Sequence, residues 1–100
     1  MSNIQTLSVF SVSNMDGLTP TDALLKIGEE YGELCAAHLN KENKPNKSAS
    51  SSPNVEEEAV DLLICVLDYL NKSGFSAYDI NEMIDKKVPK WKAKVERSFK

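Results

Sequence analysis

The sequence is poor in several features, and each shortage excludes a class of protein. Two cysteines, Cys35 and Cys65, stand in 100 residues, and both lie in apolar segments where free buried thiols are common. No apolar run approaches the ~20 residues that a membrane helix needs, and residues 1–20 lack the basic and apolar regions of a signal peptide. We therefore expect a cytoplasmic protein without disulfides and without a membrane partner.

The composition is that of a folded chain, with 41% hydrophobic and 27% charged residues. We expect residues 1–100 to form a single domain. A chain of this length buries only roughly two thirds of its unfolded surface, so assembly into a homodimer or homotetramer is a reasonable way to bury more.

Charge is divided unevenly along the chain. Residues 1–78 carry 11 acidic and 5 basic residues, whereas residues 79–100 carry 4 acidic and 7 basic residues. A nucleic-acid binder usually has a broader basic surface, so we expect no nucleic-acid partner. The uneven charge instead indicates a group of carboxylates in residues 1–78 and basic side chains that bind an anion in residues 79–100.

Apolar spacing predicts an all-α bundle of three to four helices, because no segment alternates as a strand does. Thr19 and Pro20 begin a first helix, and the second runs from about Pro53 to Lys72. The second helix is apolar almost all round, which is typical of a central, buried helix. The last helix runs from Ser76 to about Ser98, and Pro89 is expected to kink or divide it.

Two segments are less patterned. Residues 1–18 are expected to form an N-terminal arm that is either a short helix or an extended segment. The apolar residues that could mark one face of the helix are Ile4, Leu7, Phe10 and Val12. A turn is expected at residues 14–17. Residues 41–54 are rich in Asn, Lys, Ser and Pro, which indicates a flexible, solvated loop between two helices.

Pairs of carboxylates recur at helical spacing. Glu30 and Glu33 share one face of the first long helix, and Glu58 and Asp61 share one face of the second. Asp61 precedes Leu62-Leu63-Ile64 in the helix expected to be buried, where an unpaired carboxylate is costly. Lysines or a divalent metal would offset that charge.

An all-oxygen ligand set suits a hard cation, Mg²⁺ with Mn²⁺ as a substitute. Two antiparallel helices that each provide an acidic pair can hold one or two such ions. The alternative is that these glutamates form a solvated helix face, and acidic residues also favour a helix N-terminus. Cys35, Cys65 and His38 lack the spacing of a zinc site.

The segment Glu29-Glu30-x-x-Glu33 followed by Glu58-x-x-Asp61 resembles the EExxE and ExxD signature of the MazG-like nucleoside triphosphate pyrophosphohydrolases. The resemblance covers about residues 18–95. It implies an all-α fold and Mg²⁺-dependent hydrolysis of a nucleoside triphosphate, often a deoxynucleotide, to the monophosphate and pyrophosphate. It further implies a substrate site built by packed subunits.

The same resemblance implies roles for the carboxylates. The metal ligands would be Glu30, Glu33, Glu58 and Asp61. Glu29 would be an accessory carboxylate that activates water or lies in the outer shell. The family often ends in K-x-x-x-N-x-x-R, whereas here Trp91 stands where Asn is frequent and Lys94 where Arg is frequent.

Candidate substrate contacts lie further along the chain. Lys87, Lys90 and Lys94 share a helix face and would hold pyrophosphate as point charges, or they serve only solubility. We expect Trp91 either to stack on a base or to pack in a core or subunit interface. We expect Asp68 either to hydrogen-bond a sugar or base or to pair with a lysine.

Two alternative functions are also consistent with the sequence. One is a different all-α pyrophosphatase activity, on dUTP or phosphoribosyl-ATP. The other is a non-enzymatic, oligomeric helical protein that binds nucleotides or has carboxylates only as a solvated face.

Overall fold

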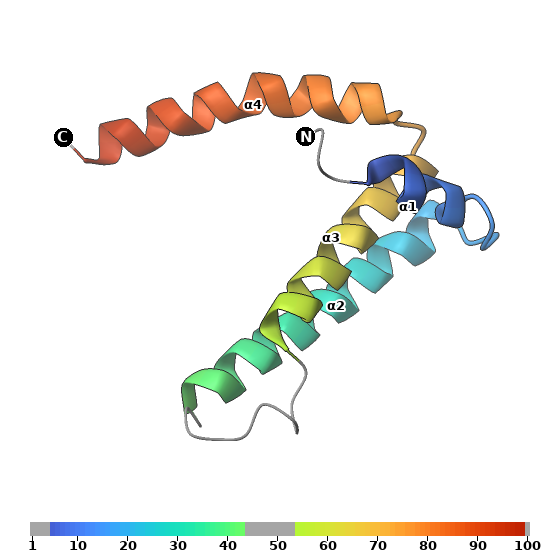
Figure 1. Cartoon of the computed structure of the whole chain (residues 1–100), viewed down its shortest axis with the longest axis horizontal. Coiled ribbons are helices and arrows are strands. Elements are labelled where there is room, and N and C mark those ends of the chain that lie inside the picture. Colours follow the sequence, from blue (N-terminus) through green and yellow to red (C-terminus); the bar gives the residue numbers. More distant parts are fainter. Residues whose placement is uncertain (1–4, 44–53, 100) are drawn as a thin grey trace.

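The structure, a computed structural model, describes residues 5–43 and 54–99. Within them the chain is all-α, as the sequence predicts, and the helices are α1 (Thr6–Ser13), α2 (Pro20–Asn43), α3 (Val55–Lys72) and α4 (Ala77–Ser98). Figure 1 shows α2 and α3 side by side as an antiparallel hairpin, with α1 against the C-terminal part of α3 and α4 running away from the hairpin. No helix in the described ranges is long and apolar enough to cross a membrane.

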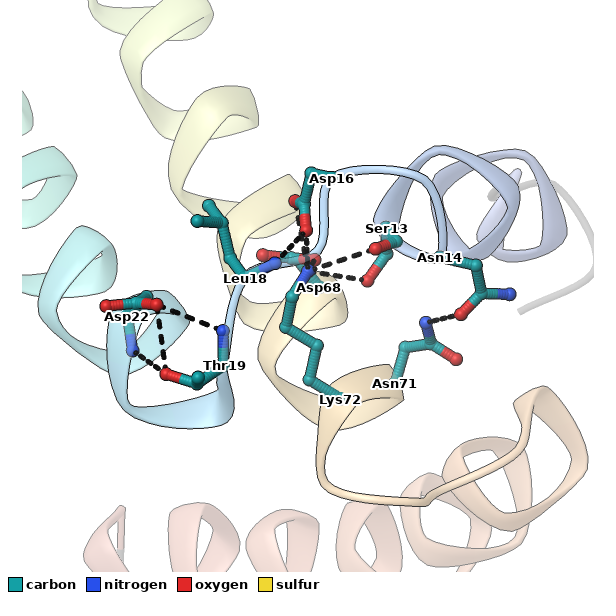
Figure 2. Close-up of polar contacts among 9 residues, drawn as sticks. All are labelled: Ser13, Asn14, Asp16, Leu18, Thr19, Asp22, Asp68, Asn71 and Lys72. Atoms are coloured by element: carbon teal, nitrogen blue, oxygen red, sulfur yellow. Dashed lines mark hydrogen bonds and ion pairs between the residues drawn. The ribbon is translucent and has the colours of Figure 1, made fainter.

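The start of α2 is set by a reciprocal pair of hydrogen bonds. The Asp22 backbone N–H donates to Thr19 Oγ1 at 3.1 Å, and the Thr19 N–H donates to Asp22 Oδ2 at 3.0 Å (Figure 2). These bonds satisfy backbone donors that a helix start otherwise leaves unpaired. At its other end α2 continues to Asn43, so the loop predicted at 41–54 begins later, and residues 44–53 lie outside the described ranges.

Both ends of α3 are capped by residues next to the helix. Asn54 provides the N-terminal cap, since its Oδ1 accepts from the Glu56 N–H at 2.7 Å. At the C-terminus Gly74 has φ +93°, a left-handed conformation that suits glycine. The Gly74 N–H donates to Asn71 O and the Phe75 N–H donates to Leu70 O, both at 3.0 Å, which forms a Schellman motif.

The helix α4 begins at a capping box formed by Ser76 and Asp79 and continues unbroken to Ser98. Of the two outcomes predicted at Pro89, a kink or a division, the division is therefore wrong. Proline removes one backbone donor and leaves the carbonyl of Asp85 without its helical partner. Both residues are exposed, so water can satisfy that carbonyl and the helix tolerates the proline.

The N-terminal segment takes the helical alternative, since α1 buries Phe10 and Ser13, whereas Ile4 lies outside the described ranges. Its anchor is Lys72, whose side chain is 7% exposed. The Lys72 Nζ donates to Ser13 O at 3.2 Å, to Ser13 Oγ at 3.1 Å and to Asp16 Oδ2 at 3.0 Å, and it also pairs with Asp68 (Figure 2). These bonds join α1 and the turn after it to the end of α3.

The core is small for a chain of this length. Among the described residues the buried apolar side chains are Phe10, Ala23, Ala37 and Leu67, and no large side chain is fully buried. The prediction that α3 is buried on all sides is wrong for the single chain, because Val60, Leu63 and Ile64 are exposed. The helices of residues 5–43 and 54–99 do not cover both faces of α3.

Replacing Gly74 should destabilise the fold. The substitution Gly74→Ala places a Cβ on a residue with φ +93°, and we expect a loss of about 1 kcal/mol in the free energy of unfolding. Urea denaturation followed by circular dichroism measures it. Gly28→Ala is the matched control, because Gly28 is helical with nothing near the added Cβ, and it should be neutral or stabilising. Equal effects of the two substitutions would contradict the assignment of Gly74 as the cap.

Replacing Lys72 should loosen the contact between α1 and α3. Hydrogen bonds to charged groups contribute about 1.5–3 kcal/mol, so Lys72→Met should lower the free energy of unfolding by about 2 kcal/mol at neutral pH. The Leu18 N–H and Lys72 lower the pKa of Asp16 below 3.8. The difference between wild type and variant should therefore shrink as the pH falls below 3.8 and Asp16 protonates. Lys86→Met, at an exposed position of α4, should have little effect in the same denaturation series.

Candidate metal centre

Three glutamates from the two long helices meet between α2 and α3. Glu30 and Glu33 lie one turn apart on α2, and Glu58 lies in the first turn of α3. One carboxylate oxygen from each residue lies within 4.8 Å of the other two. The antiparallel hairpin therefore brings together residues that are 25 to 28 positions apart in the sequence.

Two of these carboxylates are placed away from water without full compensation. Glu30 is 8% exposed, and its Oε1 forms an ion pair with Lys26 Nζ at 3.5 Å. The Oε2 atoms of Glu30 and Glu58 are both buried and have no hydrogen-bond partner in the described chain. An unpaired carboxylate oxygen in such a place costs free energy, so these atoms are suited to a positively charged ligand.

The pKa of Glu30 is also affected by its burial next to another carboxylate. Burial raises the pKa of its carboxyl above 4.5, and the nearby carboxylate of Glu33 raises that pKa further. Lys26 lowers the pKa of Glu30 but does not cancel the rise. Sequence reasoning missed Lys26, although its spacing of four residues before Glu30 is the signal for such a pair.

The donor set suits a hard cation. Mg²⁺ binds oxygen ligands at 2.0–2.1 Å, so two oxygens on opposite sides of one ion lie about 4.2 Å apart. Carboxylate oxygens within 4.8 Å of one another need only a small side-chain adjustment to reach that spacing. The group is part buried and part solvated, because two of its oxygens are buried without a partner in the described chain and the Glu33 side chain is exposed.

The other two predicted carboxylates lie outside this group of three. Asp61 is exposed one turn beyond Glu58, and Glu29 is exposed beside Glu30. The expectation that Asp61 is buried is wrong, because its side chain is exposed on α3 in the part of the chain that the structure describes. The buried carboxylates are instead Glu30 and, at its Oε2 atom, Glu58.

The predicted substrate residues are not brought to the three glutamates within one chain. Asp68 pairs with Lys72, which is the lysine alternative for this residue. The α4 residues Lys87, Lys90, Lys94 and Trp91 are exposed, and the helix that carries them runs away from the hairpin (Figure 1).

The remaining candidates have structural environments that need no ligand. His38 Nε2 lies 2.8 Å from Glu42 Oε1 at an exposed pair of α2 positions. Cys35 and Cys65 are free and half-buried.

Comparison of the chain with protein-family models, curated proteins and solved structures finds no match. The relation to the MazG-like family therefore remains a resemblance carried by the residues of the two acidic motifs.

Replacing Glu30 with its neutral isostere should stabilise the metal-free protein. A raised carboxyl pKa means that the folded state holds the proton to higher pH, so wild-type stability falls as the pH rises above 4.5 and through the raised pKa. Glu30→Gln lacks this loss. Thermal melts in EDTA should therefore show the variant more stable than wild type at pH 7.5 and similar to it at pH 4. Glu29→Gln, at the exposed neighbour, should follow the wild type at both values.

Proposed function

We propose that this chain is a Mg²⁺-dependent hydrolase that converts a nucleoside triphosphate, with deoxynucleotides the first candidates, to the monophosphate and pyrophosphate. The observation that carries the metal site is the meeting of Glu30, Glu33 and Glu58 with two buried oxygens that have no partner. The substrate class rests on the resemblance of the two acidic motifs to the MazG-like enzymes.

The proposal assigns holding and positioning roles to the hairpin. Glu30, Glu33 and Glu58 hold the ion, and Asp61, one turn along α3, completes the ligand set as a fourth carboxylate. When bound, Mg²⁺ neutralises phosphate charge and lowers the pKa of coordinated water; Mn²⁺ can take its place. Glu29 is exposed beside the group, where its carboxylate can accept a proton from the attacking water.

The basic face of α4 completes the proposal. Lys87, Lys90 and Lys94 provide three cations on one side of an exposed helix, which suits the pyrophosphate end of the substrate. Trp91 and Asp68 are the candidates for the base and sugar. These α4 residues reach the carboxylates only when α4 is packed against a hairpin, so the proposal includes a working dimer or tetramer.

The proposed compartment is the cytoplasm. Its support is chemical: Cys35 and Cys65 are free thiols, which persist in a reducing compartment.

Metal binding can be measured without any substrate. A ligand present at one hundred times its Kd stabilises the folded state by about 2.7 kcal/mol, so Mg²⁺ should raise the Tm of wild type. Neither Glu30→Gln nor Glu58→Gln should respond. Glu82→Gln, an exposed carboxylate on α4, is the control and should respond as wild type does. An equal Mg²⁺ response in all four proteins would contradict the site.

The reaction is tested with a panel of dNTPs, NTPs, dUTP and phosphoribosyl-ATP in Mg²⁺. We expect pyrophosphate and monophosphate from at least one of them, and a fall of about 100-fold or more in Glu30→Gln and Glu58→Gln, because even outer-shell changes cost 10–100-fold. Glu82→Gln should retain activity. Folded wild type that releases no pyrophosphate, or that releases single phosphate, would overturn the proposed reaction.

A further inference from the structure

The outer face of α3, opposite α2, carries an apolar stripe that the described residues of the chain leave open. Val60 is 53% exposed, Leu63 39% and Ile64 43%. Leu67 continues the same stripe by helical spacing and is buried near the end of α3 where α1 packs. The stripe is therefore covered at one end and uncovered along the rest of its length.

The helix α4 carries a second uncovered stripe. Its apolar residues recur at spacings of four, four, three and four, and they are Ile80, Ile84, Val88, Trp91 and Val95. Val88, Trp91 and Val95 are all exposed, Trp91 by 67%. A helix in a protein gains most of its stability from packing such a face, so α4 needs a surface to pack against.

The charges beside the two stripes are of opposite sign. Lys87, Lys90 and Lys94 follow one edge of the α4 stripe, whereas Glu57 and Asp61 follow one edge of the α3 stripe. All five side chains belong to exposed residues. Helix α4 thus matches the outer face of α3 in both apolar pattern and charge.

The α3 stripe of the same chain is not the partner of α4. The Schellman turn at Gly74 redirects the chain within four residues, and α4 then runs away from the hairpin (Figure 1). A second copy carries both stripes, so a two-fold axis can place each α4 on the other copy's α3 and cover both pairs at once. The helices are similar in length, about 33 Å for α4 and about 27 Å for α3.

We propose that two copies of this chain form a symmetric dimer in which α4 of each packs its apolar stripe on the outer face of α3 of the other. In it Lys87, Lys90 and Lys94 lie beside Glu57 and Asp61 of the second copy. The pairing specifies the assembly included in the proposed function, but it needs neither metal nor nucleotide. A chain that dimerises in this way and hydrolyses nothing supports the pairing and contradicts only the proposed reaction.

The first experiment measures mass. Sedimentation equilibrium of the full chain should give twice 11.1 kDa. Val88→Asp on α4 and Val60→Asp on α3 should each give monomer. Leu25→Asp replaces a leucine that is 66% exposed on α2, outside both stripes, and should leave the dimer intact. Circular dichroism confirms that each variant is folded.

Exchange of the charges tests the pairing itself. The triple variant Lys87→Glu, Lys90→Glu, Lys94→Glu should raise the dimer Kd, and so should Glu57→Lys with Asp61→Lys, by up to about fivefold for each exposed pair lost. An equimolar mixture of the two variants should form a heterodimer more tightly than either variant self-associates. No preference in the mixture would overturn the charge pairing.

Other results would overturn the dimer. A wild-type chain that is monomeric at 100 µM, with Trp91 emission shifted to the blue, would show α4 folded back on its own chain. A monomer with fully exposed Trp91 emission would leave the two stripes without a second copy. A dimer that survives both Val88→Asp and Val60→Asp would place the interface elsewhere.

Discussion

The packing of α2 against α3 is the interaction on which the other features depend. It places Glu58 opposite Glu30 and Glu33. It also positions the end of α3, where Lys72 forms hydrogen bonds with Ser13 at the end of α1 and with Asp16 in the turn that follows. It buries one apolar face of each long helix. An antiparallel pair of helices cannot cover its own outer faces. The buried carboxylates and the uncovered stripe of α3 are therefore two results of the same two-helix arrangement.

Much of the fold follows from local chemistry in the sequence. Thr19 with Asp22, Asn54, Gly74, and Ser76 with Asp79 mark helix ends because each satisfies backbone groups within a few residues. The state of Pro89 does not follow from such local chemistry. Its cost depends on whether the carbonyl of Asp85 meets water, and that depends on what packs against α4.

The spacing of carboxylates in the sequence predicts only part of the candidate site. Helical periodicity places Glu30 with Glu33, and likewise Glu58 with Asp61, on common faces, but it does not give the rotation of each helix about its axis in the packed pair. That rotation decides that Glu58 faces α2 while Asp61 is exposed. Asp68 is a second example. Its i, i+4 spacing to Lys72 allows the ion pair that the structure has, but this spacing alone does not exclude that Asp68 contacts a substrate instead.

The Lys72 contacts have a consequence for the order of folding. Lys72 and Ser13 are separated by 59 positions and Lys72 and Asp16 by 56, so these bonds close a loop that contains all of α2 and most of α3. The entropy of closing so long a loop is offset only after the hairpin has formed. Docking of α1 is therefore a late step, and weakening it should mainly speed unfolding, with little effect on the rate of folding.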